Sequence, residues 1–404
     1  MKKRVKKVVA ALAMVTLINS ISLPDVNASE ITTCEDVIQE MVSLENTQSW
    51  EEFASCWIEE EREEFNRLFS DSVYLQENEG VICVTSAEIY SLDEVPEESI
   101  PGIILEDEQY NKFPEKKYFL AGIDYEVSNV SKYFYNGVNY RLVIMAKENG
   151  VWKVAGRQDA AGLLEGWENN SYFTDVMCDE NINVAMEIHN ARIAGCVIDS
   201  DMCIEDDNEA VTYGYRPGYT ATTTCSHTRP STVKVRTGSS GNTYTSPNLE
   251  DYIKDVMPNE WVISTTGAAA LQAGVVTIQQ YAVWNSIYYQ KYPDYSYDLR
   301  ASSGDQNYVA GSYDNLAARY RTKIDEAYAA VGNIHMETGS HSSLFQSQYA
   351  STAGEYAYGR LFQDEAKTMA SNGYTYQQIL SHFYDDTTQL GISDIGTVKF
   401  VSYN

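Results

Sequence analysis

Glu260 is the residue of this 404-residue chain whose type and surroundings are best suited to chemistry. It stands two positions after Pro258 and directly before Trp261, and a run without charged residues, 265–290, follows shortly after. A carboxyl group held between an apolar helix and a tryptophan loses solvation, and this favours its protonated form. A carboxyl that keeps a proton near neutral pH can serve as a general acid. The pattern therefore makes Glu260 a candidate proton donor.

Two helices are expected to position Glu260. Asn248 can cap a first turn that contains Asp251, and apolar residues then recur at helical spacing as far as Val256. Because the residue before a proline is disfavoured in a helix, we expect Pro258 to end this element and residues 259–261 to form a turn. Residues 265–290 predict a second helix that is apolar nearly all round, as in a buried core helix rather than a membrane span.

Blocks of residues within these helices and after them occur in a defined order. They are residues 251–261 (DYIKDVMPNEW) with 270–276 and 281–284, then 298–308 (DLRASSGDQNY), then 359–363 (GRLFQ) with 369–370 and 373–384. In order and spacing they resemble the stage II sporulation protein D family, also called SpoIID/LytB, which includes amidase enhancers. The resemblance covers about residues 229–390, and ordered blocks are more specific than a single motif.

The resemblance implies a lytic transglycosylase that acts on peptidoglycan, with Glu260 as its catalytic residue. As an acid, this glutamate would protonate the glycosidic oxygen that leaves N-acetylmuramic acid. As a base, it would then take the proton of the sugar's own 6-hydroxyl, which closes an anhydro ring without water. One carboxyl group is sufficient for both steps, so the resemblance implies no cofactor.

The resemblance also implies contacts to the glycan. The positions that match polar or aromatic residues of the family's blocks are Gln306, Tyr308, Gln363 and Tyr281. The alternative for each is an ordinary buried polar group that is satisfied by the protein itself.

The chain departs from the family pattern at several positions. The long helix carries Gln279 and Gln280 where the family usually has a basic residue, and Ala269 where it has an acidic one. In the closing block, Phe362 replaces a serine, and Asp364 and Glu365 follow Gln363 in place of a segment that contains glycine. Such changes can remove hydrogen bonds or a close backbone approach to the substrate. They leave a glycan-binding protein without catalysis as an open alternative.

The N-terminus and the overall charge indicate where the protein works. Five basic residues precede the apolar run 8–18, and Val26-Asn27-Ala28 offers a cleavage site, so residues 1–28 are predicted to be a secretory signal peptide. An uncleaved membrane anchor remains the alternative. Without these residues, 24 basic and 57 acidic residues remain, a net charge of −33. Such an acidic chain disfavours nucleic-acid binding and fits a secreted, extracellular or cell-wall protein.

The length of the chain favours more than one domain. We predict a protein of the α+β class. We expect a helix-plus-antiparallel-sheet domain over 29–165, similar to cystatin-like or NTF2-like folds, a linker region over 166–228, and a mixed α/β SpoIID-like domain over 229–404. In the first domain, helices are predicted within 34–76, with Trp50, Phe53, Trp57 and Phe65 as apolar anchors. Strands are predicted at 118–130, 138–147 and 151–157. Asn149-Gly150 indicates a tight hairpin, because both residues favour positive φ.

Cysteines and histidines give weaker signals. The seven cysteines are Cys34, Cys56, Cys83, Cys178, Cys196, Cys203 and Cys225, and outside the cell they could form disulfides, although the number is odd. The family segment holds no cysteine and three histidines, His335, His341 and His382. We expect no metal site, with His335 in a strand, His341 in a loop and His382 in the closing helix.

Two functions other than catalysis stay open. The protein could bind peptidoglycan and activate a separate cell-wall amidase, as the family's enhancers imply. Alternatively, the first domain could hold a partner while the second serves as a scaffold.

Overall fold

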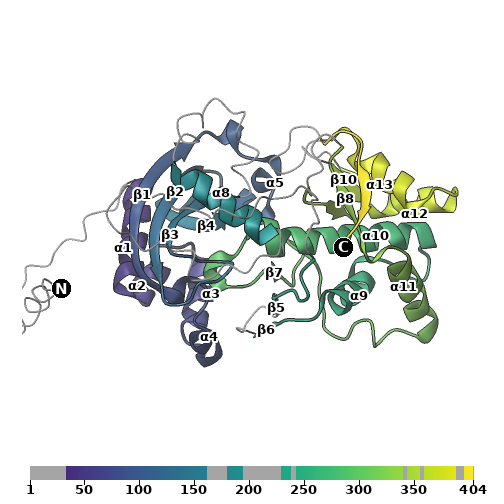
Figure 1. Ribbon diagram of the computed structural model, residues 1–404, viewed down its shortest axis with the longest axis horizontal. Helices are drawn as coiled ribbons and strands as arrows, with labels where there is room; N and C mark the ends of the chain where they lie inside the picture. The colour runs from purple at the N-terminus through teal and green to yellow at the C-terminus, as the bar shows by residue number, and fades with distance from the viewer. Residues whose placement is uncertain are drawn as a thin grey trace, which may run out of the picture.

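The computed structural model describes residues 33–161, 180–193, 229–237, 243–339, 344–354, 359–387 and 395–403. The protein is of mixed α+β class with an antiparallel sheet. Figure 1 shows the sheet and its helices, formed by the N-terminal part, beside a helical group that the C-terminal part builds around the long helix α10 (Ala268–Val283). The predicted signal peptide lies outside the described residues.

Helices precede the sheet, as predicted for residues 34–76. They are α1 (Cys34–Thr47), α2 (Trp50–Ser55), α3 (Glu59–Leu68) and α4 (Ser72–Glu77). Thr33 and Asp36 form a capping box at the start of α1, which satisfies amides that a helix leaves free. The predicted anchors Phe53, Trp57 and Phe65 are buried and pack ring against ring, whereas Trp50 is partly exposed. The aromatic spacing therefore identified this part of the core.

The antiparallel sheet runs in chain order through β1 (Val84–Val95), β2 (Lys116–Val127), β3 (Gly137–Glu148) and β4 (Val151–Asp159). The three predicted strands correspond to β2, β3 and β4. Asn149 and Gly150 both have positive φ, 53° and 84°, which confirms the predicted hairpin turn. β1 was not predicted. It is an edge strand with polar residues on much of its length, so its hydrophobic alternation is weak.

Both faces of the sheet are covered, because alternate residues of a strand point to opposite sides. Phe119 and Val143 belong to the core shared with α1–α4, whereas Leu120 and Leu142 belong to the core shared with the C-terminal part. Shorter helical segments connect the strands: Gly80–Cys83, Glu97–Ser99, α5 (Gly102–Leu105) and α6 (Glu108–Asn111).

The predicted linker, 166–228, contains an ordered helix, α8 (Glu180–Ile193). In Figure 1, α8 crosses the sheet on the side away from α1. Ile182 and Ala185 are buried in the core, so this part of the segment is not an open connection. The apolar residues of α8 are buried against the sheet and the C-terminal part, and not in a core of their own.

The helix before Glu260, α9 (Leu249–Glu260), begins as predicted, with the Asn248 side chain accepting from the Asp251 N–H at 2.9 Å. Its end was predicted wrongly, because Pro258 lies inside the helix and Glu260 is its last residue. The Trp261 N–H donates to the Met257 carbonyl at 2.8 Å, and the Asn259 side-chain amide donates to the Asp255 carbonyl at 2.7 Å. These bonds carry the helix past the proline.

The charge-free run forms α10 as a buried helix, as expected, and continues as a π-helical turn, Trp284–Tyr288. Two buried amides of α10, Gln279 and Gln280, bind neighbouring backbone. Gln280 accepts from the Met336 N–H at 2.6 Å and donates to the Phe345 carbonyl at 2.8 Å, while Gln279 donates to the Ile334 carbonyl at 2.9 Å. These amides therefore tie the buried helix to neighbouring backbone.

The remaining elements surround α10. They are β5 (Val235–Thr237), β6 (Thr243–Thr245), a 3-10 turn at Pro293–Tyr295, β7 (Leu299–Arg300), α11 (Ala318–Val331), β8 (Ile334–Glu337), β9 (Gln348–Ala350), β10 (Arg360–Phe362), α12 (Gln363–Ser371), α13 (Tyr376–Tyr384) and β11 (Lys399–Ser402). β5 pairs with β6 and β7, β8 with β11 antiparallel, and β9 with β10 in parallel. His335 lies in β8 and His382 in α13, as predicted, whereas His341 lies outside the described residues.

The predicted boundary between the two parts is crossed by shared packing. Tyr292, Tyr295 and Tyr297 belong to the core of α1–α4 although they lie in the C-terminal part of the sequence. Arg157 of β4 donates to Asp294 from Nε at 3.0 Å and from Nη2 at 2.6 Å, and all these atoms are buried. The segment 291–300 is therefore held inside the N-terminal half.

Glu45 of α1 also faces Arg157 in this buried cluster, with neither side chain exposed. Burial raises the pKa of Glu45 to about 7, although Arg157 opposes the rise. Between about pH 4.5 and 7 the folded protein therefore binds a proton that the unfolded chain has released, so this group adds stability as the pH falls through that range. We expect Glu45→Gln to raise the free energy of unfolding at pH 8 by about 1 to 3 kcal/mol and to flatten its pH dependence.

Urea unfolding of both proteins at pH 5 and pH 8 measures this effect. The Glu45→Gln gain should be large at pH 8 and small at pH 5. Equal differences at the two pH values would contradict the role given to Glu45.

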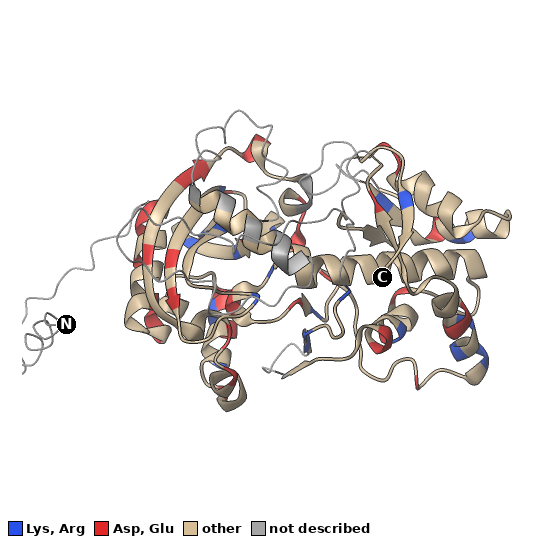
Figure 2. Ribbon diagram, in the orientation of Figure 1, with Lys and Arg blue, Asp and Glu red and all other residues tan. Residues whose placement is uncertain are grey.

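Figure 2 shows Asp and Glu residues in both halves of the protein. Cys34, Cys56 and Cys83 are buried free thiols whose pKa is raised by burial, and the other four cysteines lie outside the described residues. Among the helices described, none is both long and apolar enough to cross a membrane.

Candidate active site

Glu260 closes α9 and is partly buried, with its carboxylate against the loop that follows β7. Its Oε1 accepts a hydrogen bond from the Asn307 backbone N–H at 2.8 Å. Within the part of the chain that the structure describes, its second oxygen, Oε2, makes no hydrogen bond. The protein therefore orients the carboxylate through one of its two oxygens.

Two of the predicted glycan contacts lie on either side of Asn307. Gln306 is fully buried, accepts from the Tyr252 hydroxyl at 2.7 Å and donates to the Ile278 carbonyl at 3.3 Å. The Tyr308 ring stacks on Tyr252, with centroids 5.3 Å apart. These contacts tie the loop to α9 and α10, so Gln306 acts as an anchor as well as a neighbour of Glu260.

Tyr281 is held on the same loop from α10. Its hydroxyl donates to Asp305 Oδ1 at 3.1 Å, one residue before Gln306. Burial raises the pKa of Tyr281 well above its usual range, and the nearby Asp305 carboxylate adds to the rise. The hydroxyl therefore stays protonated and remains a donor.

Tyr349 of β9 adds an aromatic group to the site. Burial raises the pKa of its phenol well above the usual range, and the charge of Glu260 raises it further. The sequence did not single out Tyr349, because its neighbours are polar and match no block. Asn307 and Tyr252 lie inside recognised blocks, but no pattern showed that one supplies a backbone donor and the other a stacking surface.

Gln363 stands apart from this group. It is the first residue of α12, directly after β10, whose Leu361 pairs with Tyr349. Its side chain is buried and makes no hydrogen bond to Glu260, Gln306, Tyr308 or Tyr281 in the described structure. Of the five predicted residues, four therefore gather around Asn307, and Gln363 is connected to them through the β9–β10 pair.

Other polar residues of α9 fix the far end of the loop. Asp255 accepts from the Gly311 and Tyr313 N–H groups, each at 2.9 Å, and Asn259 donates to the Ser312 hydroxyl at 3.0 Å. Val262 and Val309, which follow the two contacting segments, are each 55% exposed. The contact between Glu260 and Asn307 thus lies on a fixed backbone with exposed apolar side chains beside it.

Trp261 positions Glu260 through a close contact with α10. A Cβ added at Gly274 would lie 2.7 Å from Cε2 of the buried Trp261 ring. We expect Gly274→Ala to displace Trp261 and to lower the free energy of unfolding by about 1 to 3 kcal/mol, because overpacking forces the neighbours to move. The readout is urea unfolding together with the near-ultraviolet circular dichroism of tryptophan.

Gly267→Ala is the matched control for Gly274→Ala. A Cβ at Gly267, before the first turn of α10, would meet the Ala370 Cβ at an ordinary 3.5 Å, so we expect a loss below about 1 kcal/mol. Equal losses in the two variants would show that the contact between Gly274 and Trp261 is not tight.

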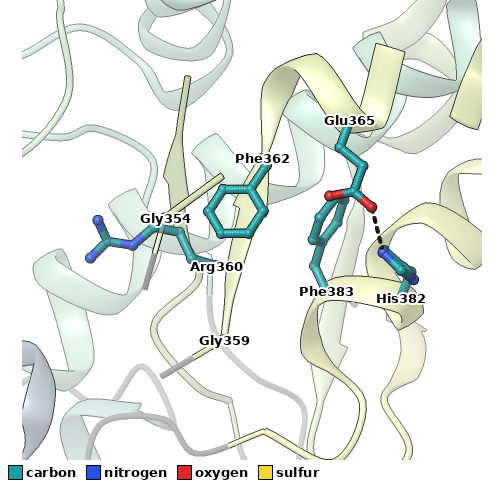
Figure 3. Close-up of a pocket in the computed structure, with 7 residues that line it drawn as sticks. All are labelled: Gly354, Gly359, Arg360, Phe362, Glu365, His382 and Phe383. Atoms are coloured by element: carbon teal, nitrogen blue, oxygen red, sulfur yellow. Dashed lines mark hydrogen bonds and ion pairs between the residues drawn. The ribbon is translucent and has the colours of Figure 1, made fainter. Parts of the chain in front are cut away.

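A hollow lies over α12 and α13, apart from Glu260. Figure 3 shows Glu365 turned toward His382, with Oε1 and Nε2 2.9 Å apart, and Phe362 and Phe383 beside them. The two phenylalanine rings meet edge to face at 5.7 Å. Gly354, Gly359 and Arg360 complete the lining. Phe362 and Glu365 therefore shape this hollow, and Glu260 does not line it.

Among the described residues, no cluster of three or more His, Cys, Asp or Glu side chains is placed to bind a metal ion. His335 is buried, and its Nε2 lies 3.0 Å from Glu337 Oε1 in the same strand.

Comparison with known proteins gives no assignment. No protein-family model matches this chain, and no curated protein matches it.

Proposed function

We propose that this protein is a secreted lytic transglycosylase that cleaves peptidoglycan glycan strands at N-acetylmuramic acid. The observation that carries the proposal is the setting of Glu260. Its Oε1 is held by the Asn307 N–H, its Oε2 is free among the described residues, and Gln306, Tyr308 and Tyr281 gather on the same loop.

The chemistry needs one carboxyl group that works in both directions. Oε2 of Glu260 would donate its proton to the glycosidic oxygen as the bond to the sugar's C1 breaks, leaving an oxocarbenium-like centre. Oε2 would then accept the proton of the sugar's own 6-hydroxyl, while the 6-hydroxyl oxygen bonds to C1. The Asn307 N–H keeps the carboxyl in one orientation through both steps, which is how a fixed donor assists catalysis.

The wider assignment rests on the resemblance to the SpoIID family. We propose a SpoIID-like domain in the C-terminal part and a cystatin-like or NTF2-like arrangement of helices and antiparallel sheet in the N-terminal part. The acidic composition and the predicted signal peptide support a location in the cell wall or outside the cell. A cell-wall amidase is a candidate partner, and membrane attachment would require an uncleaved signal anchor.

The second candidate function is peptidoglycan binding without cleavage, as in an amidase enhancer or a scaffold. The specific observation in its favour is the closing block, where Phe362 replaces a serine and Glu365 pairs with His382. These side chains add bulk and charge where the family pattern has small residues, which changes the shape that a glycan would meet.

Digestion of purified sacculi separates the two functions. The full mature protein is incubated with sacculi, with and without a purified amidase, and the released muropeptides are identified by mass spectrometry. Products ending in anhydro-N-acetylmuramic acid without amidase support the transglycosylase. Faster release of stem peptides by the amidase, without anhydro ends, would support the enhancer and would overturn the proposed cleavage.

A further inference from the structure

Lys291 is a buried amine that joins the two halves of the protein. Its Nζ lies 2.7 Å from Asp107 Oδ2, at the start of α6, and 3.1 Å from Asp305 Oδ1, in the loop beside Glu260. The exposed fractions of the three side chains are 7%, 13% and 0%, in the order Lys291, Asp107, Asp305. Shielding from water strengthens the attraction between these charges, and removing one partner would leave the others buried and unpaired.

Asp305 passes this restraint to the loop. Oδ1 accepts from Lys291 and from the Tyr281 hydroxyl, and Oδ2 accepts from the Arg300 N–H at 2.8 Å. The loop closes on itself as Ala301 pairs with Gln306. The next residue, Asn307, is the one whose N–H binds Glu260. Asp305 thus stands two residues from the donor that orients the candidate catalytic carboxyl.

Lys291 stays charged between its two carboxylate partners. Burial acts to lower the pKa of Lys291, but Asp107 and Asp305 more than offset it, so the pKa lies well above its usual range and the amine stays charged. Asp107 is itself fixed, because its Oδ1 accepts from the Gln109 N–H at 2.9 Å and caps α6. The N-terminal half therefore presents a rigid carboxylate to Lys291.

A second connection holds the start of the same loop. Glu61 of α3 receives both guanidinium ends of Arg300, at 3.0 Å and 2.9 Å. Burial alone would raise the pKa of Glu61, but Arg300 lowers it below the usual value, so the pair is ionised at neutral pH. The N-terminal half thus contacts the loop at two points. Glu61 binds Arg300 directly, and Asp107 binds Asp305 through Lys291.

We propose that Asp107 and Lys291 are positioning residues through which the N-terminal half sets the conformation of the loop 301–308 and thereby the orientation of Glu260. The consequence for cleavage rests on the proposed function, whereas the ordering of the loop does not. On this view the N-terminal half is part of the working site and is not a detachable module.

The test uses Lys291→Met in the full mature protein, with amide hydrogen exchange followed by mass spectrometry. We expect exchange in 301–308 to rise about 10- to 100-fold, while the sheet β1–β4 and α10 keep wild-type protection. If the protein cleaves glycan, kcat should fall about 10- to 100-fold with KM changed by less than about threefold, because misplacing a catalytic group affects the chemical step.

A second variant tests the same contact from the N-terminal half, and a third is a control at the surface. Asp107→Asn keeps the shape and the cap of α6 but removes one charge, and should raise exchange in 301–308 by a smaller factor even if Lys291→Met does not fold. Lys112→Met is the matched control, because Lys112 pairs with Glu60 on the exposed surface and has no contact with the loop.

The outcomes separate this proposal from the proposed function. Wild-type exchange in 301–308 for both Lys291→Met and Asp107→Asn would overturn it, as would a rise of equal size throughout the sheet and α10. A wild-type protein that releases no anhydro products would remove the transglycosylase assignment, and the exchange measurements would still decide whether Asp107 and Lys291 order the loop.

Discussion

Glu260→Gln is expected to abolish the release of anhydromuropeptides and to leave the fold unchanged. The substitution keeps the size of the side chain and an oxygen that can accept from the Asn307 N–H, but it removes the transferable proton. Loss of general acid and base catalysis costs at least about 10² to 10⁴ in rate, and one group performs both steps here. The measurement is mass spectrometry of products from sacculi, with circular dichroism to verify folding.

Glu250→Gln is the matched control for this experiment. Glu250 lies on the same helix, pairs with Lys254 at 2.8 Å and is 48% exposed, so we expect wild-type turnover and stability changed by less than about 1 kcal/mol. If Glu260→Gln released anhydro products at the wild-type rate, Glu260 would be a structural acceptor for the loop and not the catalytic acid.

Arg157→Met is expected to have the largest effect on stability. Arg157 lies between Asp294 and Glu45, with all three side chains buried, and also donates to the Tyr125 hydroxyl at 3.1 Å. Removal of the cation leaves carboxylates without a charged partner in the interior, which costs about 3 to 5 kcal/mol. We expect urea unfolding at pH 8 to show this loss, together with faster exchange in 291–300.

The control for this variant is Lys117→Met. Lys117 pairs with Glu94 at 2.9 Å across the edge of the sheet, and the side chains are 39% and 48% exposed, so the loss should be below about 1 kcal/mol. A similar small loss for Arg157→Met would mean that the two halves do not depend on this cluster for their stability.

The sequence by itself determined the features that depend on local chemistry. The hairpin at Asn149-Gly150 follows from two residues that tolerate positive φ. The start of α9 follows from Asn248, whose side chain caps the N–H of Asp251 three residues later. The burial of α10 follows from a run without charge. The order of the blocks also placed Glu260, Gln306, Tyr308 and Tyr281 in one region, although it could not assign a partner to any of them.

The tertiary structure decided what depends on distant residues. Helix α9 passes Pro258 because Asn259 and Trp261 supply hydrogen bonds to the preceding carbonyls and Met257 is buried against the core. Strand β1 has too little alternation to be predicted, and it forms because β2 offers a paired edge. Lys291 and Asp107 lie far apart in the sequence, and no local pattern indicates that they meet. The contact between Lys291 and Asp107 forms only when the two halves pack together and exclude water from it. It therefore could not be predicted from the sequence around either residue.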